Sequence, residues 1–226
     1  MPAMDFELYS HRNAQEIAES VNFRKDWEVF QEAIASVSDQ DLKMAFKALG
    51  ARREGKRKEG QKSLSHAINE VLRKKLGALG WDLEPTLFSK EKAGLGSSGW
   101  KLDFVKRLPN SRTRQKSCTF AVEVAFNHSE AAAWVLTKLA LACERTTIPK
   151  DIDATIGILV VMQSDLKKAG NFDGSCCTYA RYIHTIKVMH DLLRAPLLVV
   201  GLGPPKTFRL KGHARGVRIV GVIEDV

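Results

Sequence analysis

In the first third of the chain, apolar residues recur three and four positions apart, which is the spacing of one face of an α-helix. We expect residues 10–50 to be helical, with Asp39 capping the last of three segments and Gly50 ending it. One of these segments has an apolar stripe of four residues: Trp27, Phe30, Ile34 and Val37. After a basic stretch, a stronger pattern predicts a helix from Ser63 to about Leu79.

From residue 81 onward, short apolar runs alternate with helical patterns. In chain order, the expected elements are strands at 81–88, 100–105 and 118–128, a helix at 129–144, a strand at 154–162, a helix around 179–189, a strand at 197–202, and a strand pair at 207–210 and 217–222. The run 154–162 is apolar almost throughout, which is typical of a parallel strand covered on both faces. This order predicts an α/β (α+β) fold with a mixed central β-sheet and helices on both faces.

The length of 226 residues suits one domain. We expect residues 1–226 to form a single domain with three parts. These are a helical amino-terminal part with a basic loop over residues 1–62, a core over residues 63–202, and a carboxy-terminal strand pair over residues 203–226.

The chain is basic, with 35 Lys and Arg residues against 26 Asp and Glu residues and a net charge of +9. This surplus favours a polyanionic partner over a small neutral substrate. The sequence shows neither a long apolar run nor a secretion signal at its start, so we expect a cytoplasmic protein without membrane contact. Its four cysteines lack zinc-binding spacing, which indicates reduced thiols.

Two carboxylates interrupt the apolar strands, Asp103 in the second and Glu123 in the third. Alternation along the third strand places Glu123 on the same face as Ala121 and Ala125. A lone carboxylate in a strand is typical of an edge residue or a salt-bridge partner. Two on neighbouring strands joined by a basic hairpin favour a shared divalent cation or a shared proton.

Five sequence stretches resemble the type II restriction endonucleases of the BglII group, within the PD-(D/E)XK nuclease superfamily. They are Tyr9-Ser-His-Arg-Asn13, Gly80-Trp81, Lys101-Leu-Asp-Phe-Val-Lys106, Val122-Glu-Val-Ala-Phe-Asn-His128 and Ile156-Gly-Ile-Leu-Val-Val161. Their order and spacing cover roughly residues 7–202. The resemblance implies a restriction-endonuclease-like core and one nuclease domain, with its catalytic core at residues 63–202.

The resemblance also implies an activity. It predicts Mg²⁺-dependent hydrolysis of phosphodiester bonds at a specific palindromic site in double-stranded DNA, by a homodimer of a restriction-modification system. Two alternatives keep the same fold. One is a structure-specific DNA repair nuclease, and the other is a catalytically inactive DNA-binding protein.

By resemblance, Asp103 and Glu123 hold Mg²⁺, with the backbone carbonyl of Val124 as a further ligand. Two residues after Glu123, the related groups have Lys, Gln or Glu, whereas this chain has Ala125. The water-activating group is therefore expected elsewhere. Lys101 is our first choice, because alternation places it on the face of Asp103. The alternatives are Lys138, Glu130, His128 or no protein group at all.

Residues expected to contact DNA lie where strands end and in basic loops. They are Asn127, His128, Gln163, Ser164, Asp165, Lys167, Arg112 and Arg114. Asn127 can pair with adenine in the major groove, and it can also cap the following helix. Asp165 can equally be a helix cap. Arg112 and Arg114 lie in the basic hairpin, which suits a phosphate backbone.

Overall fold

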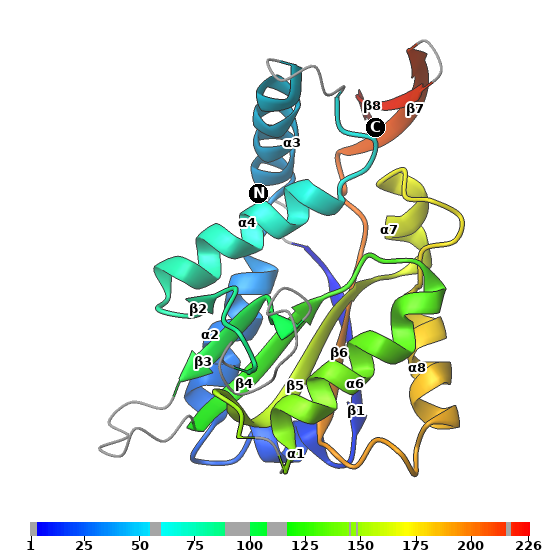
Figure 1. Ribbon diagram of the computed structural model, residues 1–226. Helices are drawn as coiled ribbons and strands as arrows, with labels where there is room; N and C mark the ends of the chain where they lie inside the picture. The colour runs from blue at the N-terminus through cyan, green and yellow to red at the C-terminus, as the bar shows by residue number, and fades with distance from the viewer. Residues whose placement is uncertain are drawn as a thin grey trace.

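The structure is a computed structural model that describes residues 4–54, 60–88, 100–107, 117–144, 146–147, 149–215 and 218–226. Its centre is a six-stranded mixed sheet with the strand order β1-β6-β5-β4-β3-β2 (Figure 1). The strands are β1 (Phe6–His11), β2 (Asp82–Leu83), β3 (Phe104–Arg107), β4 (Ser117–Val124), β5 (Asp153–Met162) and β6 (Leu197–Leu202). Strands β4, β5 and β6 run parallel, whereas β1 is antiparallel to β6, and β3 is antiparallel to β4 and β2.

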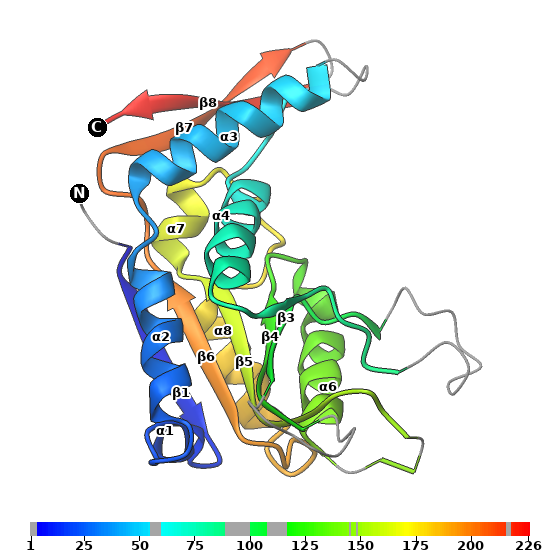
Figure 2. The same ribbon diagram turned by 90° about the vertical axis from the view of Figure 1, so that its left-hand side faces the viewer.

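Helices cover both faces of this sheet (Figure 2). They are α1 (Ala14–Ala18), α2 (Arg24–Ala35), α3 (Asp39–Glu54), α4 (Ser65–Ala78), α6 (Ala132–Cys143), α7 (Ser164–Ala169) and α8 (Tyr179–Val188), with a 3₁₀ turn, η2, at Ser129–Ala131. Helices α1, α2 and α4 pack on one face, and α6 and α8 pack on the other. The predicted α+β fold with a mixed, doubly covered sheet is confirmed.

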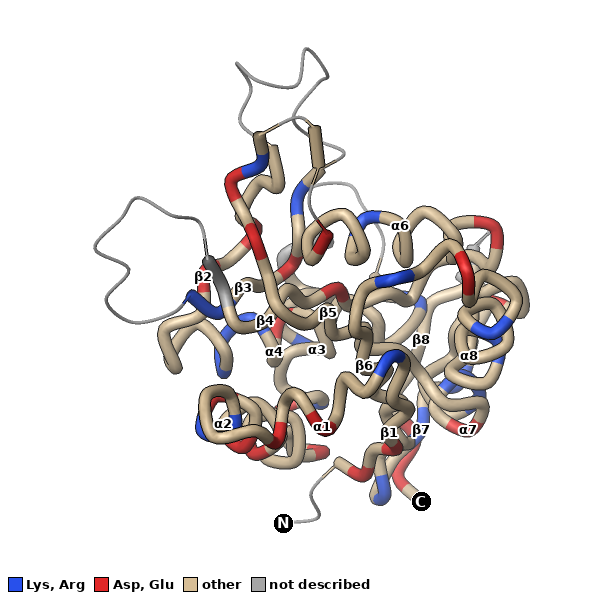
Figure 3. Tube along the Cα trace, turned by 90° about the horizontal axis from the view of Figure 1, so that it is seen from below, with Lys and Arg blue, Asp and Glu red and all other residues tan. Residues whose placement is uncertain are grey.

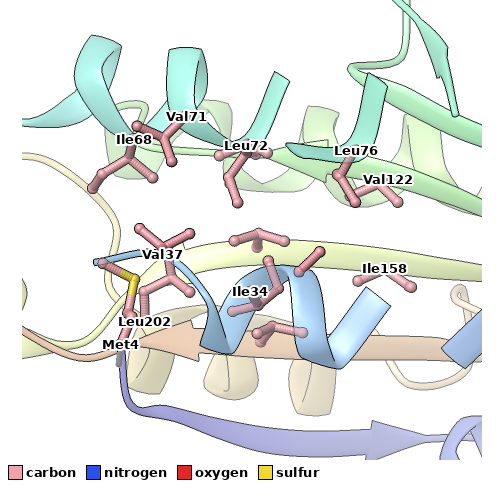
Figure 4. Close-up of a cluster of buried hydrophobic side chains, with 14 of the residues drawn as sticks. Met4, Ile34, Val37, Ile68, Val71, Leu72, Leu76, Val122, Ile158 and Leu202 are labelled. Carbon is pink, nitrogen blue, oxygen red and sulfur yellow. The ribbon is translucent and has the colours of Figure 1, made fainter. Parts of the chain in front are cut away.

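The face under α2 and α4 holds the larger hydrophobic cluster. Ile34 from α2 and Leu72 and Leu76 from α4 belong to the same cluster as Val122 of β4 (Figure 4). Four stacked or tilted aromatic rings extend this cluster, namely Trp27, Phe30, Trp81 and Phe120, with centroid distances of 5.5 to 6.2 Å. Burial of each such side chain contributes about 1.5–3 kcal/mol. The predicted stripe Trp27, Phe30, Ile34 and Val37 is entirely buried.

The amino-terminal part of the chain differs from the predicted elements in three places. Residues 6–11 form strand β1, which the sequence reading missed because its partner β6 is nearly 190 residues further along the chain. Helix α3 continues past Gly50 to Glu54, because one glycine inside a helix costs only about 1 kcal/mol. Asp39 is not the helix cap. Its Oδ2 accepts hydrogen bonds from the backbone N–H groups of Lys206 and Thr207, at 2.9 and 2.7 Å.

The cap of α3 is instead a reciprocal pair. The Asp41 N–H donates to Ser38 Oγ, and the Ser38 N–H donates to Asp41 Oδ2, both at 3.1 Å. This is the capping-box arrangement, which satisfies two otherwise free backbone donors. The pattern Ser-x-x-Asp is visible in the sequence, so this cap could have been predicted.

Further along the chain, most elements lie where they were expected, with shorter strands around the two carboxylates. The first predicted strand is reduced to Asp82–Leu83, and β3 begins at Phe104, directly after Asp103. The polar segment predicted as a loop after β5 contains the short helix α7. The final strand pair is confirmed as a longer hairpin, β7 (Phe208–Arg215) and β8 (Arg218–Asp225).

This hairpin packs beside α3 at one end of the molecule (Figure 2). An ion pair between Lys43 of α3 and Asp225 of β8, at 2.6 Å, joins the two elements. None of the helices within the described residues is long and apolar enough to cross a membrane.

Close packing of α8 on the sheet requires glycine at position 201 of β6. A Cβ at this position would lie 2.6 Å from Cδ2 and 2.7 Å from Cγ of Tyr179, close to the stem of that side chain. We therefore expect Gly201→Ala to lower the free energy of unfolding by about 1–3 kcal/mol, because the ring cannot easily move aside. Urea denaturation followed by circular dichroism measures the change.

Gly50→Ala is the matched control, because a Cβ at Gly50 meets nothing within 4 Å in the helix α3. It should raise the free energy of unfolding by about 0.5–1 kcal/mol. Equal effects of the two substitutions would contradict the packing argument.

Candidate active site

The antiparallel pairing of β3 with β4 brings the two predicted carboxylates together. Phe104 pairs with Val122, so Asp103 lies beside the end of β4. Its backbone N–H donates to the Val122 carbonyl at 3.1 Å, and its Oδ2 accepts a hydrogen bond from the Val124 N–H at 2.7 Å. The backbone of β4 thus holds Asp103 next to Glu123.

Glu123 lies on the sheet face that α6 covers. As the alternation predicted, Ala121 and Ala125 belong to the hydrophobic cluster on this face, whereas Val122 and Val124 belong to the cluster on the other face. Glu123 is only 6% exposed. Burial and the nearby charge of Asp103 raise the pKa of Glu123 to about 8, against the opposing effect of Lys138.

Asp103 is half-buried. Burial raises its pKa, and the hydrogen bond from Val124 and the charge of Lys138 act in the opposite direction. The negative charge of Glu84 raises the pKa further. The positive charge of Lys138 therefore does not fully balance the negative charge that the two carboxyl groups would carry when ionised.

Lys138 projects from α6 to these carboxylates. Its Nζ lies 2.8 Å from Glu123 Oε1, and it donates to the backbone carbonyl of Lys101 at 2.7 Å. The contact with Glu123 is an ion pair, and the buried Oε1 accepts no aligned hydrogen bond from the described residues.

Lys101, our first choice for the water-activating group, points its side chain elsewhere. Its Nζ lies 3.7 Å from Glu84 Oε2, and the side chain is 51% exposed. Glu84 also pairs with Arg73. The part of Lys101 that reaches the site is its backbone carbonyl, which accepts the hydrogen bond from Lys138.

The sequence did contain a signal for Lys138. It is the one charged residue in the twelve residues of α6, which otherwise hold apolar residues and one threonine. Figure 3 shows α6 mostly in the colour of uncharged residues. A single lysine in a helix of this kind needs a partner for its charge, but the sequence does not show that Glu123 is that partner.

Another polar group on the same face is the hydroxyl of Tyr182, from α8. It is completely buried and has no hydrogen-bond partner among the described residues. Burial, with smaller contributions from Cys177 and Glu123, raises the pKa of Tyr182, so that the phenol stays neutral. The sequence indicated Tyr182 only as part of an apolar helix face.

These residues fit a divalent cation. Asp103 and Glu123 supply hard oxygen ligands, and the buried Oε1 of Glu123, although paired with Lys138, accepts no aligned hydrogen bond from the described residues. No group of three or more His, Cys, Asp or Glu side chains suited to a metal occurs within the described part of the chain. Two carboxylates with room for water and substrate oxygens are typical of Mg²⁺ sites.

The residues predicted to read DNA gather at the carboxyl ends of β4 and β5. Asn127 and His128 are exposed three and four residues after the end of β4, and Ser164 and Asp165 are exposed in the first turn of α7 after β5. Backbone hydrogen bonds join the first of these regions to the segment between α7 and α8: Cys177 N–H donates to Asn127 O, and Ser129 N–H donates to Ser175 O, each at 2.9 Å. His128 Nδ1 also contacts Ser175 Oγ.

Two of the predicted DNA contacts also have bonds within the fold. The Gln163 amide donates to the Gly201 carbonyl at 3.0 Å. The Lys167 ammonium donates to the carbonyls of Gly174 and Cys176, at 2.6 and 2.8 Å. The α7 N-cap position is Gln163, with no side-chain cap bond from it, and Asp165 follows inside the first turn. Arg112 and Arg114 lie outside the described residues.

Comparison with known proteins identifies the family. The family model described as "Restriction endonuclease BglII/BglIII" matches residues 6–202. The chain belongs to the BglII/BglIII restriction endonuclease family. The resemblance drawn from the sequence motifs is thereby confirmed, and a nuclease that acts on DNA is the function of this family. Restriction endonucleases generally use divalent metal ions, which agrees with the donor set at Asp103 and Glu123.

Comparison with solved structures concerns the fold. The crystal structure of the restriction endonuclease BglII complexed with a DNA 16-mer has a TM-score of 0.60 at 14% identity, over 99% of this chain and 100% of the other. Free BglII has a TM-score of 0.48 at 13% identity, over the same shares. At such low identity, the first likeness shows the fold alone. No curated protein matches the chain.

The raised pKa of Glu123 predicts that metal binding to this BglII-family site depends on pH. Without metal, the carboxyl group keeps its proton up to about pH 8, and a cation must displace that proton. The affinity for Ca²⁺ without DNA should therefore rise, roughly 25-fold, between about pH 6.5 and about pH 8.5. Isothermal titration calorimetry at the two pH values measures this rise.

Glu123→Gln is the control, because its amide cannot titrate. It should bind Ca²⁺ weakly and with little dependence on pH. An affinity of the unchanged protein that is the same at both pH values would show that Glu123 is not a ligand with a raised pKa.

Proposed function

We propose that this protein is a Mg²⁺-dependent type II restriction endonuclease that hydrolyses phosphodiester bonds at a specific palindromic site in double-stranded DNA. The observation that supports this most strongly is the pair of carboxylates across β3 and β4, where the Val124 N–H holds Asp103 beside the buried Glu123. This pair lies at the end of the sheet where Asn127 and Ser164 are exposed.

In this proposal, Asp103, Glu123 and the backbone carbonyl of Val124 hold Mg²⁺. When bound, Mg²⁺ neutralises charge on the phosphate and lowers the pKa of a bound water. The hydrogen bond from Val124 fixes the orientation of the Asp103 carboxylate before the metal and the substrate arrive. Such preorganisation avoids a reorganisation cost during the reaction.

Asn127, His128, Gln163, Ser164 and Asp165 are the proposed base-reading residues. Asn127 and His128 are exposed four and five residues after Glu123, so they can approach bases next to the reacting phosphate. Lys167 is proposed as a phosphate contact together with Arg112 and Arg114. An ammonium has three donors, and its two carbonyl bonds leave the third for a phosphate oxygen.

We also propose a homodimer that acts in the cytoplasm. Each copy would contribute the Asp103–Glu123 pair, and cutting both strands of a palindrome requires two equivalent sites related by a two-fold axis. The related BglII structure is a complex with DNA, which supports duplex DNA as the partner.

Digestion of a long, sequenced DNA with Mg²⁺ tests this function. We expect discrete fragments whose mapped ends share one palindromic sequence, because base contacts at both half-sites are needed for cleavage. Nicking that requires a branched DNA would instead support a structure-specific repair nuclease. Binding without any cleavage would support an inactive DNA-binding protein.

Asp103→Asn and Glu123→Gln test the site assignment. Each keeps the shape of the side chain and removes its charge, so each should lower the cleavage rate by at least about 1,000-fold. Binding of a site-containing duplex in Ca²⁺, measured by fluorescence anisotropy, should persist. Glu28→Gln is the control, since Glu28 is an exposed acid on α2, across the sheet from the site. Cleavage by either site variant at the rate of this control would refute the assignment.

A further inference from the structure

We propose that Lys138 is a catalytic residue of this enzyme. Its ammonium group takes the place of the longer side chain that related enzymes have on the strand at the position of Ala125. This inference rests on the proposed nuclease function and concerns one question within it, namely which protein group contacts the attacking water. The structure answers this differently from the sequence, which favoured Lys101.

The first argument is position. Ala125 and Glu123 are on the same face of the sheet, and α6 packs over this face through Val135, Leu136 and Leu139. Lys138 leaves α6 between these apolar residues and ends 2.8 Å from Glu123 Oε1. The small side chain of Ala125 leaves room for a side chain from the helix. A longer residue at position 125 would occupy that space.

The second argument is the way in which Lys138 is held. Its side chain is 12% exposed, and its Nζ donates to the Lys101 carbonyl at 2.7 Å. That carbonyl lies two residues before Asp103, on the segment that leads into β3. Lys138 therefore connects α6 with the segments that hold both carboxylates, which fixes its ammonium group relative to them.

The third argument is the number of donors. An ammonium group has three N–H donors and no acceptor. The Lys101 carbonyl takes one donor, and the ion pair with Glu123 Oε1 includes no aligned hydrogen bond. A donor is therefore left for the oxygen of the attacking water, at the carboxylates where the phosphate would lie.

The reaction step keeps Lys138 protonated. The water oxygen forms a new bond to phosphorus, and the bond from phosphorus to the leaving sugar oxygen breaks. One proton of the water passes to solvent, and the leaving oxygen takes a proton from solvent. Lys138 orients the water through its N–H donor and stabilises the negative charge that develops on the phosphate.

Lys101 is less suited to this role. Its ammonium group is 51% exposed and 3.7 Å from Glu84, so solvent and a second carboxylate compete for its charge. Its backbone carbonyl instead supports Lys138. Lys101→Met keeps this carbonyl, so it should lower the cleavage rate far less than Lys138→Met.

The test compares single-turnover cleavage by Lys138→Met and Lys138→Arg. Methionine keeps much of the apolar stem and removes the cation, and we expect a rate lower by about 100-fold or more. Arginine keeps the charge and should cleave at least about tenfold faster than the methionine variant. The dissociation constant for duplex DNA in Ca²⁺ should stay within about threefold for both variants, because binding does not need the attacking water.

Lys150→Met is a matched control for the loss of a buried lysine near α6. Lys150 Nζ donates to the carbonyls of Leu141 and Ala142 at the end of this helix, at 3.0 and 2.8 Å, and pairs with Asp153. This variant should lower the melting temperature but leave the cleavage rate within about threefold. A purely structural role for Lys138 would make the two methionine variants alike.

The outcomes separate this inference from the proposed function. If the unchanged protein does not cleave DNA, or if Asp103→Asn cleaves normally, the proposed function fails. If Asp103→Asn is inactive but Lys138→Met cleaves within about threefold of the unchanged rate, only the role of Lys138 fails. Equal rates for Lys138→Arg and Lys138→Met would also overturn it, because the charge would then have no effect.

Discussion

The hydrogen bond from the Val124 N–H to Asp103 Oδ2 determines the geometry of the site. It connects the last residue of β4 to the residue just before β3, and the pairing of these strands leaves no other place for the two carboxylates than side by side. Like charges at such a distance repel, and burial of Glu123 increases the cost of ionising it. The raised pKa values of both groups follow from this arrangement. The sheet therefore keeps a local excess of negative charge that a divalent cation can neutralise.

The two faces of the sheet contribute to this site in different ways. Under α2 and α4, large apolar and aromatic side chains form a dense cluster that stabilises β4 and β5 from below the site. On the opposite face, Ala121 and Ala125 leave space beside Glu123, and α6 supplies Lys138. A cationic side chain from a helix can balance part of the negative charge, so that no long side chain is needed on the strand. The arrangement links the packing of α6 directly to the electrostatics of the carboxylates.

Parallel strands explain why the proposed recognition residues lie near the chemistry. Strands β4 and β5 end at the same edge of the sheet, so Asn127 and His128 lie near the start of α7 although they are about 36 residues apart in the chain. Backbone hydrogen bonds connect residues 127–129 with residues 175–177, and Lys167 of α7 donates to the carbonyls of Gly174 and Cys176 in the same segment. Side chains that read bases can then be placed relative to the reacting phosphate by the same rigid sheet.

The sequence by itself determined the elements with a strong periodic pattern and the two carboxylates. The stripe of α2, the helix α4 and the apolar strands β5 and β6 depend on local spacing, and the motifs around Asp103 and Glu123 indicated the nuclease family. Tertiary structure alone decided the rest. Strand β1 depends on pairing with β6 across nearly the whole chain, Asp39 bonds to residues 206 and 207 instead of capping its helix, and Lys138 rather than Lys101 reaches Glu123. Each of these depends on contacts between residues far apart in sequence, and local hydrophobic periodicity contains no information about such contacts.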